Sequence, residues 1–181
     1  MASSLASAPK KENDFASQVQ QATSQSNGEL LQLVSFVVGT EEFAIPILSV
    51  QEINRMMPIT RVPQSPPFVE GVINLRGKII PVMDLRKRFG LARQDATSDA
   101  RIIVVEVASR VIGFMVDRVN EVLRINADIV EPPPSMVCGI ESDYVQGVGK
   151  LQDRLLILLS LERLFNSEVA QEMYDTTSAA Q

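Results

Sequence analysis

The chain has 181 residues, of which 45% are hydrophobic and 5% aromatic, and its formal net charge is −5 at pH 7. This acidic balance argues against non-specific binding to nucleic acid or to an anionic membrane surface. The sequence has no histidine and one cysteine, Cys138, which excludes histidine catalysis, histidine-ligated metals and an intramolecular disulfide. No apolar run approaches the roughly 18 residues of a membrane span, and the first residues lack a secretory core. We therefore expect a soluble, cytoplasmic protein.

Both ends of the chain have the composition of unstructured segments. Residues 1–28 are rich in Ser, Ala, Gln and Lys with little apolar periodicity, which predicts a disordered N-terminal arm. Residues 174–181 are expected to form a flexible tail. The folded region is then predicted to span residues 30–173.

Four pairs of short apolar runs, each pair interrupted by turn residues, predict four β-hairpins. Pro46 and Pro81 lie inside such runs, and because proline cannot donate to a ladder we expect them at strand ends, bulges or edges. The pattern predicts a mostly β fold of barrels or a sandwich. The predicted turns are Gly39-Thr40, Arg76-Gly77, Ala108-Ser109-Arg110 and Gln152-Asp153.

Helices are expected to be few. Ser49 and Glu52 have the S-x-x-E spacing of a capping box, which predicts a helix over residues 50–57. Asp84 is placed to cap a short turn over residues 85–89, which Gly90 would end. Ser160 is placed to cap the longest predicted helix, residues 161–174.

The chain contains an internal repeat. Residues 68–89 align without a gap on residues 144–165, 76 positions later, and residues 37–53 align more weakly on residues 106–122, 69 positions later. The fold is therefore predicted to hold two copies of one β unit. Gly71 and Gly147 coincide in this alignment, which favours a shared backbone position that will not take a Cβ, or a bulge.

The repeat also serves as a control for Arg76. Arg76-Gly77 aligns with Gln152-Asp153, so the hairpin closes in one copy without an arginine and the fold does not require Arg76. Two interpretations remain open, a solvated turn charge and an interface residue, for which arginine is well suited. Glu52 aligns with Glu121, which favours a structural role.

The sequence lacks the motifs of common enzymes. Residues 147–151, GVGKL, fail the P-loop pattern, no GxGxxG opens a helix, and no close pair of carboxylates is evident. Residues 86–93, RKRFGLAR, are the one basic cluster, which we interpret as a solvated helix face. We predict no catalytic residues, no metal and no cofactor. Two alternatives are a barrel that binds single-stranded nucleic acid, disfavoured by the few aromatic residues, and a hydrolase with scattered carboxylates.

Around residues 70–90, EGVINLRGKIIPVMDLRKRFG, the sequence resembles the CheW family of chemotaxis coupling proteins. The resemblance extends from about Leu31 to Asn166. It implies a mostly β fold of two intertwined SH3-like β-barrel subdomains that share a hydrophobic core, with a few short helices and a C-terminal helix. It also implies a non-catalytic adaptor that couples methyl-accepting chemoreceptors to the histidine kinase CheA.

The resemblance assigns the two partners to different surfaces. It implies that receptor signalling tips bind a groove between the barrels, and that the kinase regulatory domain binds exposed turns of the first barrel and residues 131–136. Other CheW copies are further expected partners in array rings, and the protein is expected in the cytoplasm, recruited to membrane receptor arrays without inserting into the membrane. The receptor residues are Arg76, Val50, Glu52, Gly71, Asn74 and Val122, and the kinase residues are Arg61, Val62, Gly77 and Met136.

The sequence leaves the output of the pathway open. Couplers of flagellar chemotaxis and of twitching or surface sensing share this resemblance, so a non-flagellar chemosensory pathway is the alternative.

Overall fold

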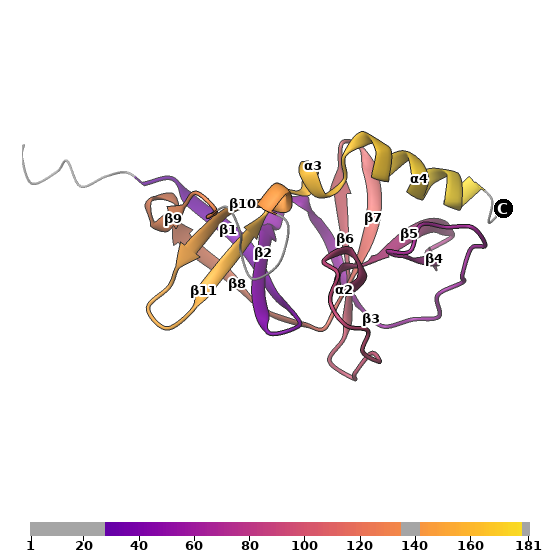
Figure 1. Ribbon diagram of the computed structural model, residues 1–181, viewed down its shortest axis with the longest axis horizontal. Helices are drawn as coiled ribbons and strands as arrows, with labels where there is room; N and C mark the ends of the chain where they lie inside the picture. The colour runs from indigo at the N-terminus through magenta and orange to yellow at the C-terminus, as the bar shows by residue number, and fades with distance from the viewer. Residues whose placement is uncertain (1–27, 135–141, 179–181) are drawn as a thin grey trace, which may run out of the picture.

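The computed structural model describes residues 28–134 and 142–178, and it consists mainly of β-strands (Figure 1). The arm predicted over residues 1–28 lies outside this part of the chain, apart from Gly28. The strands are β1 (Leu30–Val38), β2 (Glu41–Pro46), β3 (Val50–Arg55), β4 (Val69–Leu75), β5 (Lys78–Asp84), β6 (Arg101–Val107), β7 (Arg110–Val116), β8 (Arg118–Asn126), β9 (Val130–Glu131), β10 (Val145–Lys150) and β11 (Leu155–Leu159). The helices are α2 (Leu85–Arg88), α3 (Leu161–Leu164) and α4 (Ser167–Ser178), with 3₁₀ turns η1 (Ile47–Ser49), η2 (Ala127–Ile129) and η3 (Ser142–Tyr144).

The strands form two sheets that curl into barrels lying side by side (Figure 1). One sheet has the order β8-β1-β2-β11-β10-β9 and is called the β1 barrel. The other has the order β3-β6-β7-β5-β4 and is called the β6 barrel. All four predicted hairpins are present, so the expectation of two similar β-barrel units is confirmed.

The two barrels repeat each other down to the strand register. Val34 of β1 pairs with Val122 of β8, and 69 positions on Ile103 of β6 pairs with Ile53 of β3. The parallel contacts are repeated as well, since β2 pairs with β11 and β7 with β5. The duplication inferred from sequence is therefore a duplication of geometry.

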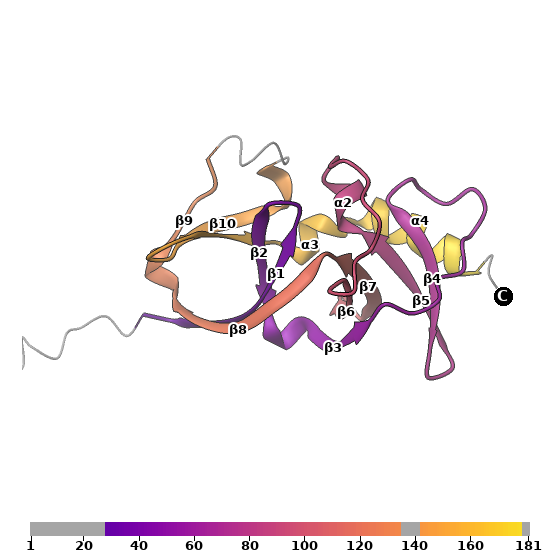
Figure 2. The same cartoon turned by 90° about the horizontal axis from the view of Figure 1, so that it is seen from below.

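The barrels are intertwined because each copy of the repeat contributes strands to both barrels. After β2 the chain leaves the β1 barrel through η1, and β3 joins the β6 barrel; after β7, β8 returns to the β1 barrel (Figure 2). Each barrel is thus built from both copies, which is why neither half of the chain contains a complete barrel.

The largest hydrophobic cluster lies between the barrels. It takes Val34 and Phe36 from β1, Ile103 and Val105 from β6, and Met173 from α4, all nearly inaccessible to solvent. Two smaller clusters fill the barrel interiors, around Leu33 in one and around Ile102 in the other. This burial of branched aliphatic side chains is the main force that holds the two copies together.

Gly71 and Gly147 occupy equivalent positions where another backbone approaches closely. A Cβ on Gly71 would lie 2.2 Å from the Thr60 carbonyl oxygen, and one on Gly147 would lie 2.9 Å from that of Glu131. Both ladders also shift register here, between Val69 and Gly71 and between Val145 and Gly147. The predicted shared position without room for a Cβ, at a bulge, is confirmed.

The helix predicted over residues 50–57 is wrong, because this segment is β3. Its partly buried positions are Val50, Glu52 and Asn54, a period-two pattern that polar side chains conceal in the sequence. Ser49 ends the 3₁₀ turn before the strand and caps no helix there.

The other helix predictions fare better. The Asp84 carboxylate accepts backbone N–H groups of Arg86 and Lys87 at the start of α2, as predicted. Ser160 caps α3 by accepting the Arg163 N–H, but the predicted helix is broken, and Asn166 Oδ1 accepts the Val169 N–H at the start of α4. Because α4 runs to Ser178, residues 174–178 of the expected flexible tail are helical.

Of the two prolines, Pro46 lies where the sequence predicts and Pro81 does not. Pro46 ends β2, as expected, whereas Pro81 lies in the middle of β5, between β4 and β7. Val72, opposite Pro81, exchanges both its backbone hydrogen bonds with Thr60, and the ladder to β7 begins only at Val82. Pro81 is therefore tolerated because no neighbouring strand needs its missing N–H.

Candidate partner-binding site

The β4–β5 hairpin closes with a turn that places Arg76 in a left-handed conformation. Arg76 has φ +52° and Gly77 has φ +82°, the pair of positive values found in a type I′ turn. The Asn74 side-chain oxygen accepts the Gly77 N–H at 2.9 Å and so supports the turn. Arginine at such a position costs about 1–2 kcal/mol relative to glycine, because its Cβ crowds the following carbonyl.

The equivalent hairpin between β10 and β11 closes without this strain. The Leu151 N–H donates to the Arg154 carbonyl, and neither Gln152 nor Asp153 has a positive φ. Turn closure therefore does not explain Arg76. An outlier that the fold does not need is the kind of observation from which a functional role is inferred.

The Arg76 guanidinium is exposed but oriented. Its Nη2 lies 3.0 Å from Glu52 Oε2 of β3, and the two side chains are 82% and 23% exposed. Glu121, equivalent to Glu52, pairs with Arg154 at 2.6 Å in the other barrel. An arginine of a hairpin thus pairs with a glutamate of β3 in one barrel and with a glutamate of β8 in the other. Such exposed pairs contribute at most about 1 kcal/mol, so this pair holds the guanidinium in place more than it holds the fold together.

Val50 and Val122 lie on the layer between the barrels. Val50 pairs with Val105 and Val122 with Val34, and both partners belong to the inter-barrel core. Val50 packs against this core from β3. Directly paired residues share one face of a sheet, so Val122 of β8 lies on the same face as Val34. Val122 is 57% exposed. It lies in the β1 barrel, whereas the five other expected receptor residues lie in the β6 barrel.

Of the six expected receptor residues, the structure thus joins Arg76 to Glu52 and Asn74 to Gly77. It packs Val50 against the inter-barrel core and pairs the exposed Val122 with Val34 of that core. Gly71 is buried against Thr60 and shapes the backbone rather than presenting a surface.

The expected kinase residues differ in their exposure to solvent. Arg61 is 74% exposed and pairs with Glu70 at 3.7 Å, and Gly77 is exposed at the hairpin tip. Val62 is 7% exposed, so the expectation that it lies on an exposed turn is wrong. Met136 lies outside the described residues.

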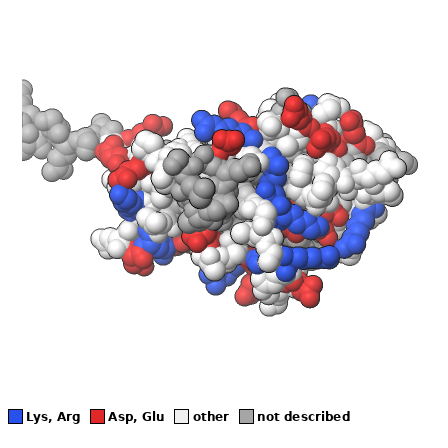
Figure 3. Space-filling model, in the orientation of Figure 1, with Lys and Arg blue, Asp and Glu red and all other residues white. Residues whose placement is uncertain are grey.

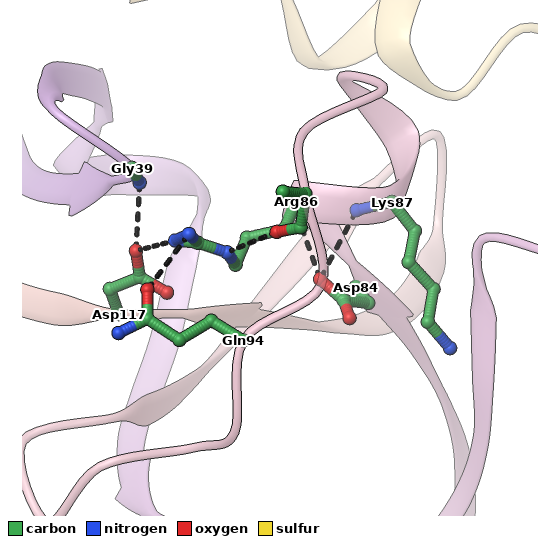
Figure 4. A network of polar contacts seen from close by, with 7 residues as sticks. Gly39, Asp84, Arg86, Lys87, Gln94 and Asp117 are labelled. Atoms are coloured by element: carbon green, nitrogen blue, oxygen red, sulfur yellow. Dashed lines mark hydrogen bonds and ion pairs between the residues drawn. The ribbon is translucent and has the colours of Figure 1, made fainter.

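The basic cluster at residues 86–93 is not the solvated helix face that we expected. Arg86 is 14% exposed, and its guanidinium donates to Asp117 Oδ2, to Gln94 Oε1 at 2.9 Å and to the Ala92 carbonyl at 3.2 Å (Figure 4). Asp117 Oδ2 also accepts the Gly39 N–H at 2.7 Å. Because Gly39 belongs to the β1 barrel and Arg86 to the β6 barrel, this network fastens one barrel to the other.

The neighbours of Arg86 are also engaged. The Lys87 ammonium pairs with Glu70. The Arg88 guanidinium lies over the rings of Phe68 and Tyr144, 4.9 and 4.6 Å from their centroids. Sequence reasoning missed these contacts because the partners of Arg86 and Arg88 lie up to 56 positions away, and no local pattern marks them.

Three further features concern surface charge, metal binding and membrane spans. Figure 3 shows acidic and basic side chains interspersed over one face, with acidic groups along α4. Within residues 28–134 and 142–178, no group of three or more His, Cys, Asp or Glu is placed to hold a metal ion. No helix in these ranges is long and apolar enough to span a membrane.

Comparison with known proteins places the chain in a family. Residues 32–169 match the model of the CheW-like domain. The chain is 38% identical over 144 residues to the chemotaxis protein CheW of Helicobacter pylori, which covers 80% of this chain and 87% of the relative. It is 39% identical over 133 residues to CheW of Klebsiella aerogenes, covering 74% and 80% of the two chains.

A solved structure agrees with these matches. The crystal structure of the scaffolding protein TtCheW from Thermoanaerobacter tengcongensis superimposes with a TM-score of 0.72 at 39% identity, covering 78% of this chain and 96% of that chain. The fold, the duplicated barrels and the sequence matches lead to one conclusion: this chain belongs to the CheW-like domain family.

Proposed function

We propose that this protein is a non-catalytic scaffold that couples methyl-accepting chemoreceptors to the histidine kinase CheA in chemosensory arrays. The relatives are named chemotaxis proteins and a scaffolding protein, and they cover most of the folded region. The structural observation that carries the proposal is Arg76, exposed and fixed by Glu52 in a strained turn that the other barrel closes without strain.

The receptor-binding surface would combine this guanidinium with the apolar rim between the barrels. Val50 and Val122 extend the inter-barrel core toward solvent on β3 and β8, and they would bury the apolar face of a receptor helix. Arg76 would then supply orientation and specificity, because its planar guanidinium presents several donors in a fixed geometry. Asn74, Glu52 and Gly71 would act by holding Arg76 and its strand in place.

The kinase would bind exposed turns of the first barrel, at Arg61 and at Gly77, with Met136 on a second surface. Val62 is buried and would contribute by supporting the neighbouring Arg61 rather than by direct contact. Further copies of the chain would join the same rings. The protein would act in the cytoplasm, recruited to membrane-bound receptors, without enzymatic activity, metal or cofactor. Its output is flagellar motility or, alternatively, a twitching or surface-sensing pathway.

Size-exclusion chromatography of the full chain, a receptor signalling-tip fragment and the kinase regulatory domain tests the coupling role. We expect one ternary complex, because the two surfaces do not coincide. If either partner displaced the other, or if neither bound, the coupling proposal would be wrong.

A further inference from the structure

A cavity of about 460 Å³ lies between the barrels where β2 crosses to β3. Its lining includes Ser49 from the crossover, Glu106 and Ala108 from the end of β6 and the following turn, Gln146 from β10, and Glu162 and Arg163 from α3. The cavity belongs to neither the Arg76 surface nor the Arg86 network.

The repeat identifies what this cavity corresponds to. Shifts of 69 and 76 positions relate Gly39 to Ala108, and Arg86 to Glu162. The first shift also relates Leu48, which precedes Ser49, to Asp117. Gly39, Arg86 and Asp117 are the three residues that fasten the barrels together at the other crossover. The cavity is therefore the second copy of that junction.

The two copies of the junction differ in what fills them. At the first, Arg86 enters from α2, and the loop after this helix contributes Gln94 and Ala92, so the guanidinium is nearly buried. At the second, the chain continues from α3 into α4, and no equivalent loop covers the position among the described residues. Among the residues that the structure describes, the same site is thus closed by the protein itself in one copy and open in the other.

The charges at the open copy are reversed. Glu162 stands where Arg86 stands, and no ion pair of Glu162 is found among the described residues. Glu106 accepts a hydrogen bond from the Gln51 amide, and no cation of residues 28–134 or 142–178 pairs with it. Leu48 stands where Asp117 stands and is 98% exposed, the most exposed large hydrophobic side chain in the part of the chain that the structure describes. The cavity lining carries two carboxylates, Glu106 and Glu162, and one cation, Arg163, so it is acidic. The exposed Leu48 immediately precedes Ser49 of this lining.

We propose that this open junction is a docking site for a protein segment that carries an arginine next to an aliphatic residue. The arginine would enter the cavity toward Glu162 and Glu106, and the aliphatic residue would cover Leu48. Carboxylates bind a guanidinium through paired, charge-assisted hydrogen bonds, and burial of Leu48 adds apolar contact. The inference rests on the repeat and the cavity, and it is independent of the proposed receptor and kinase surfaces.

A titration of the full ¹⁵N-labelled chain tests the site. The probe is N-acetyl-leucyl-arginine amide, and its neutral counterpart carries citrulline in place of arginine. We expect saturable amide shifts centred on Ser49, Ala108 and Glu162 with the arginine probe, and much weaker shifts with the citrulline probe. Glu162→Gln should weaken binding about tenfold, as expected for loss of a charge-assisted hydrogen bond, and Leu48→Ser should weaken it further.

Glu168→Gln is the matched control, because Glu168 is an exposed glutamate on α4 outside the cavity lining. This variant should bind the arginine probe with unchanged affinity, and its amide spectrum should be that of a folded protein. Three results would overturn the proposal: equal responses to both probes, an affinity insensitive to Glu162→Gln, or no saturable shift at this junction. Because the titration uses neither receptor nor kinase, its failure would leave the proposed coupling function untouched.

Discussion

Arg86 of α2 and Asp117 at the β7–β8 crossover form an ion pair that joins the two barrels, and the same carboxylate oxygen accepts the Gly39 N–H (Figure 4). The pair is 14% and 32% exposed, far less than the Arg76–Glu52 pair. Removal of one member leaves a poorly solvated charge without its partner, so this contact should matter more to stability than its exposed counterparts do.

Arg86→Met should therefore lower the free energy of unfolding by about 2 kcal/mol, the usual cost of losing hydrogen bonds to a charged group. Arg76→Met, which removes an exposed pair, should lower it by less than about 1 kcal/mol. Urea denaturation of the two variants and the wild type measures both. Equal effects would show that the Arg86 network does not fasten the barrels.

The equivalent glycines give a sharper steric test. Gly71→Ala should destabilise the protein by about 3 kcal/mol, since the new Cβ would overlap the Thr60 carbonyl and φ is +151°. Gly77→Ala is the control, because φ is +82° there but no atom lies within 4 Å of the added Cβ. Its cost should be about 1 kcal/mol, from strain alone. Thermal unfolding followed by circular dichroism separates the two; a Gly71→Ala variant as stable as Gly77→Ala would contradict the close approach.

Much of this fold could be predicted from the sequence because its cues are local or repeated. The four hairpin turns follow from turn residues between apolar runs, and Asp84 follows from its position before a short helix. Gly71 and Gly147 were identifiable as backbone positions because the repeat places them together. Arg76 was identifiable as a candidate because the second copy of the repeat has Gln152 at the same position.

The remainder depends on contacts between distant residues. Whether β3 joins its own barrel or the other is decided by its pairing with β6, about 50 positions away, which no local pattern encodes. The capping-box spacing of Ser49 and Glu52 favoured a helix there, but burial of Val50 against the inter-barrel core overrode it. Arg86 was indistinguishable from a solvated charge because Asp117 lies 31 positions away.

Asp84 predicts a pH dependence of stability. Burial raises the pKa of its carboxyl above the ordinary 3.8, although the N–H groups of Arg86 and Lys87 and the Lys87 charge act in the opposite direction. A folded-state pKa above the unfolded value means that ionisation opposes folding, so the contribution is fully present below about pH 3.8 and is lost as the pH rises through the folded pKa.

Asp84→Asn keeps an oxygen acceptor for the helix cap and removes the ionisation. The free energy of unfolding of the wild type, measured relative to this variant in urea, should fall as the pH rises from 3.8 through the raised folded-state pKa of Asp84, and then level off. A difference that grew with pH would show instead that the cap stabilises the carboxylate more than burial disfavours it.

The proposed recognition of the receptor by Arg76 is tested by Arg76→Asn with little disturbance of the hairpin. Asparagine before glycine suits a type I′ turn, so the variant removes the guanidinium and keeps the backbone. Arg154→Asn is the matched control, since Arg154 is the hairpin arginine that pairs with Glu121 in the other barrel. Circular dichroism should show that both variants are folded.

The measurement is the dissociation constant of each variant for a receptor signalling-tip fragment and, separately, for the kinase regulatory domain. We predict that Arg76→Asn weakens receptor binding more than about tenfold, as for an interface hot spot, and leaves kinase binding unchanged, while Arg154→Asn changes neither. Receptor binding by folded Arg76→Asn within about twofold of the wild type, less than the tenfold that 1.4 kcal/mol produces, would contradict a role of Arg76 in receptor recognition and leave it a solvated turn charge.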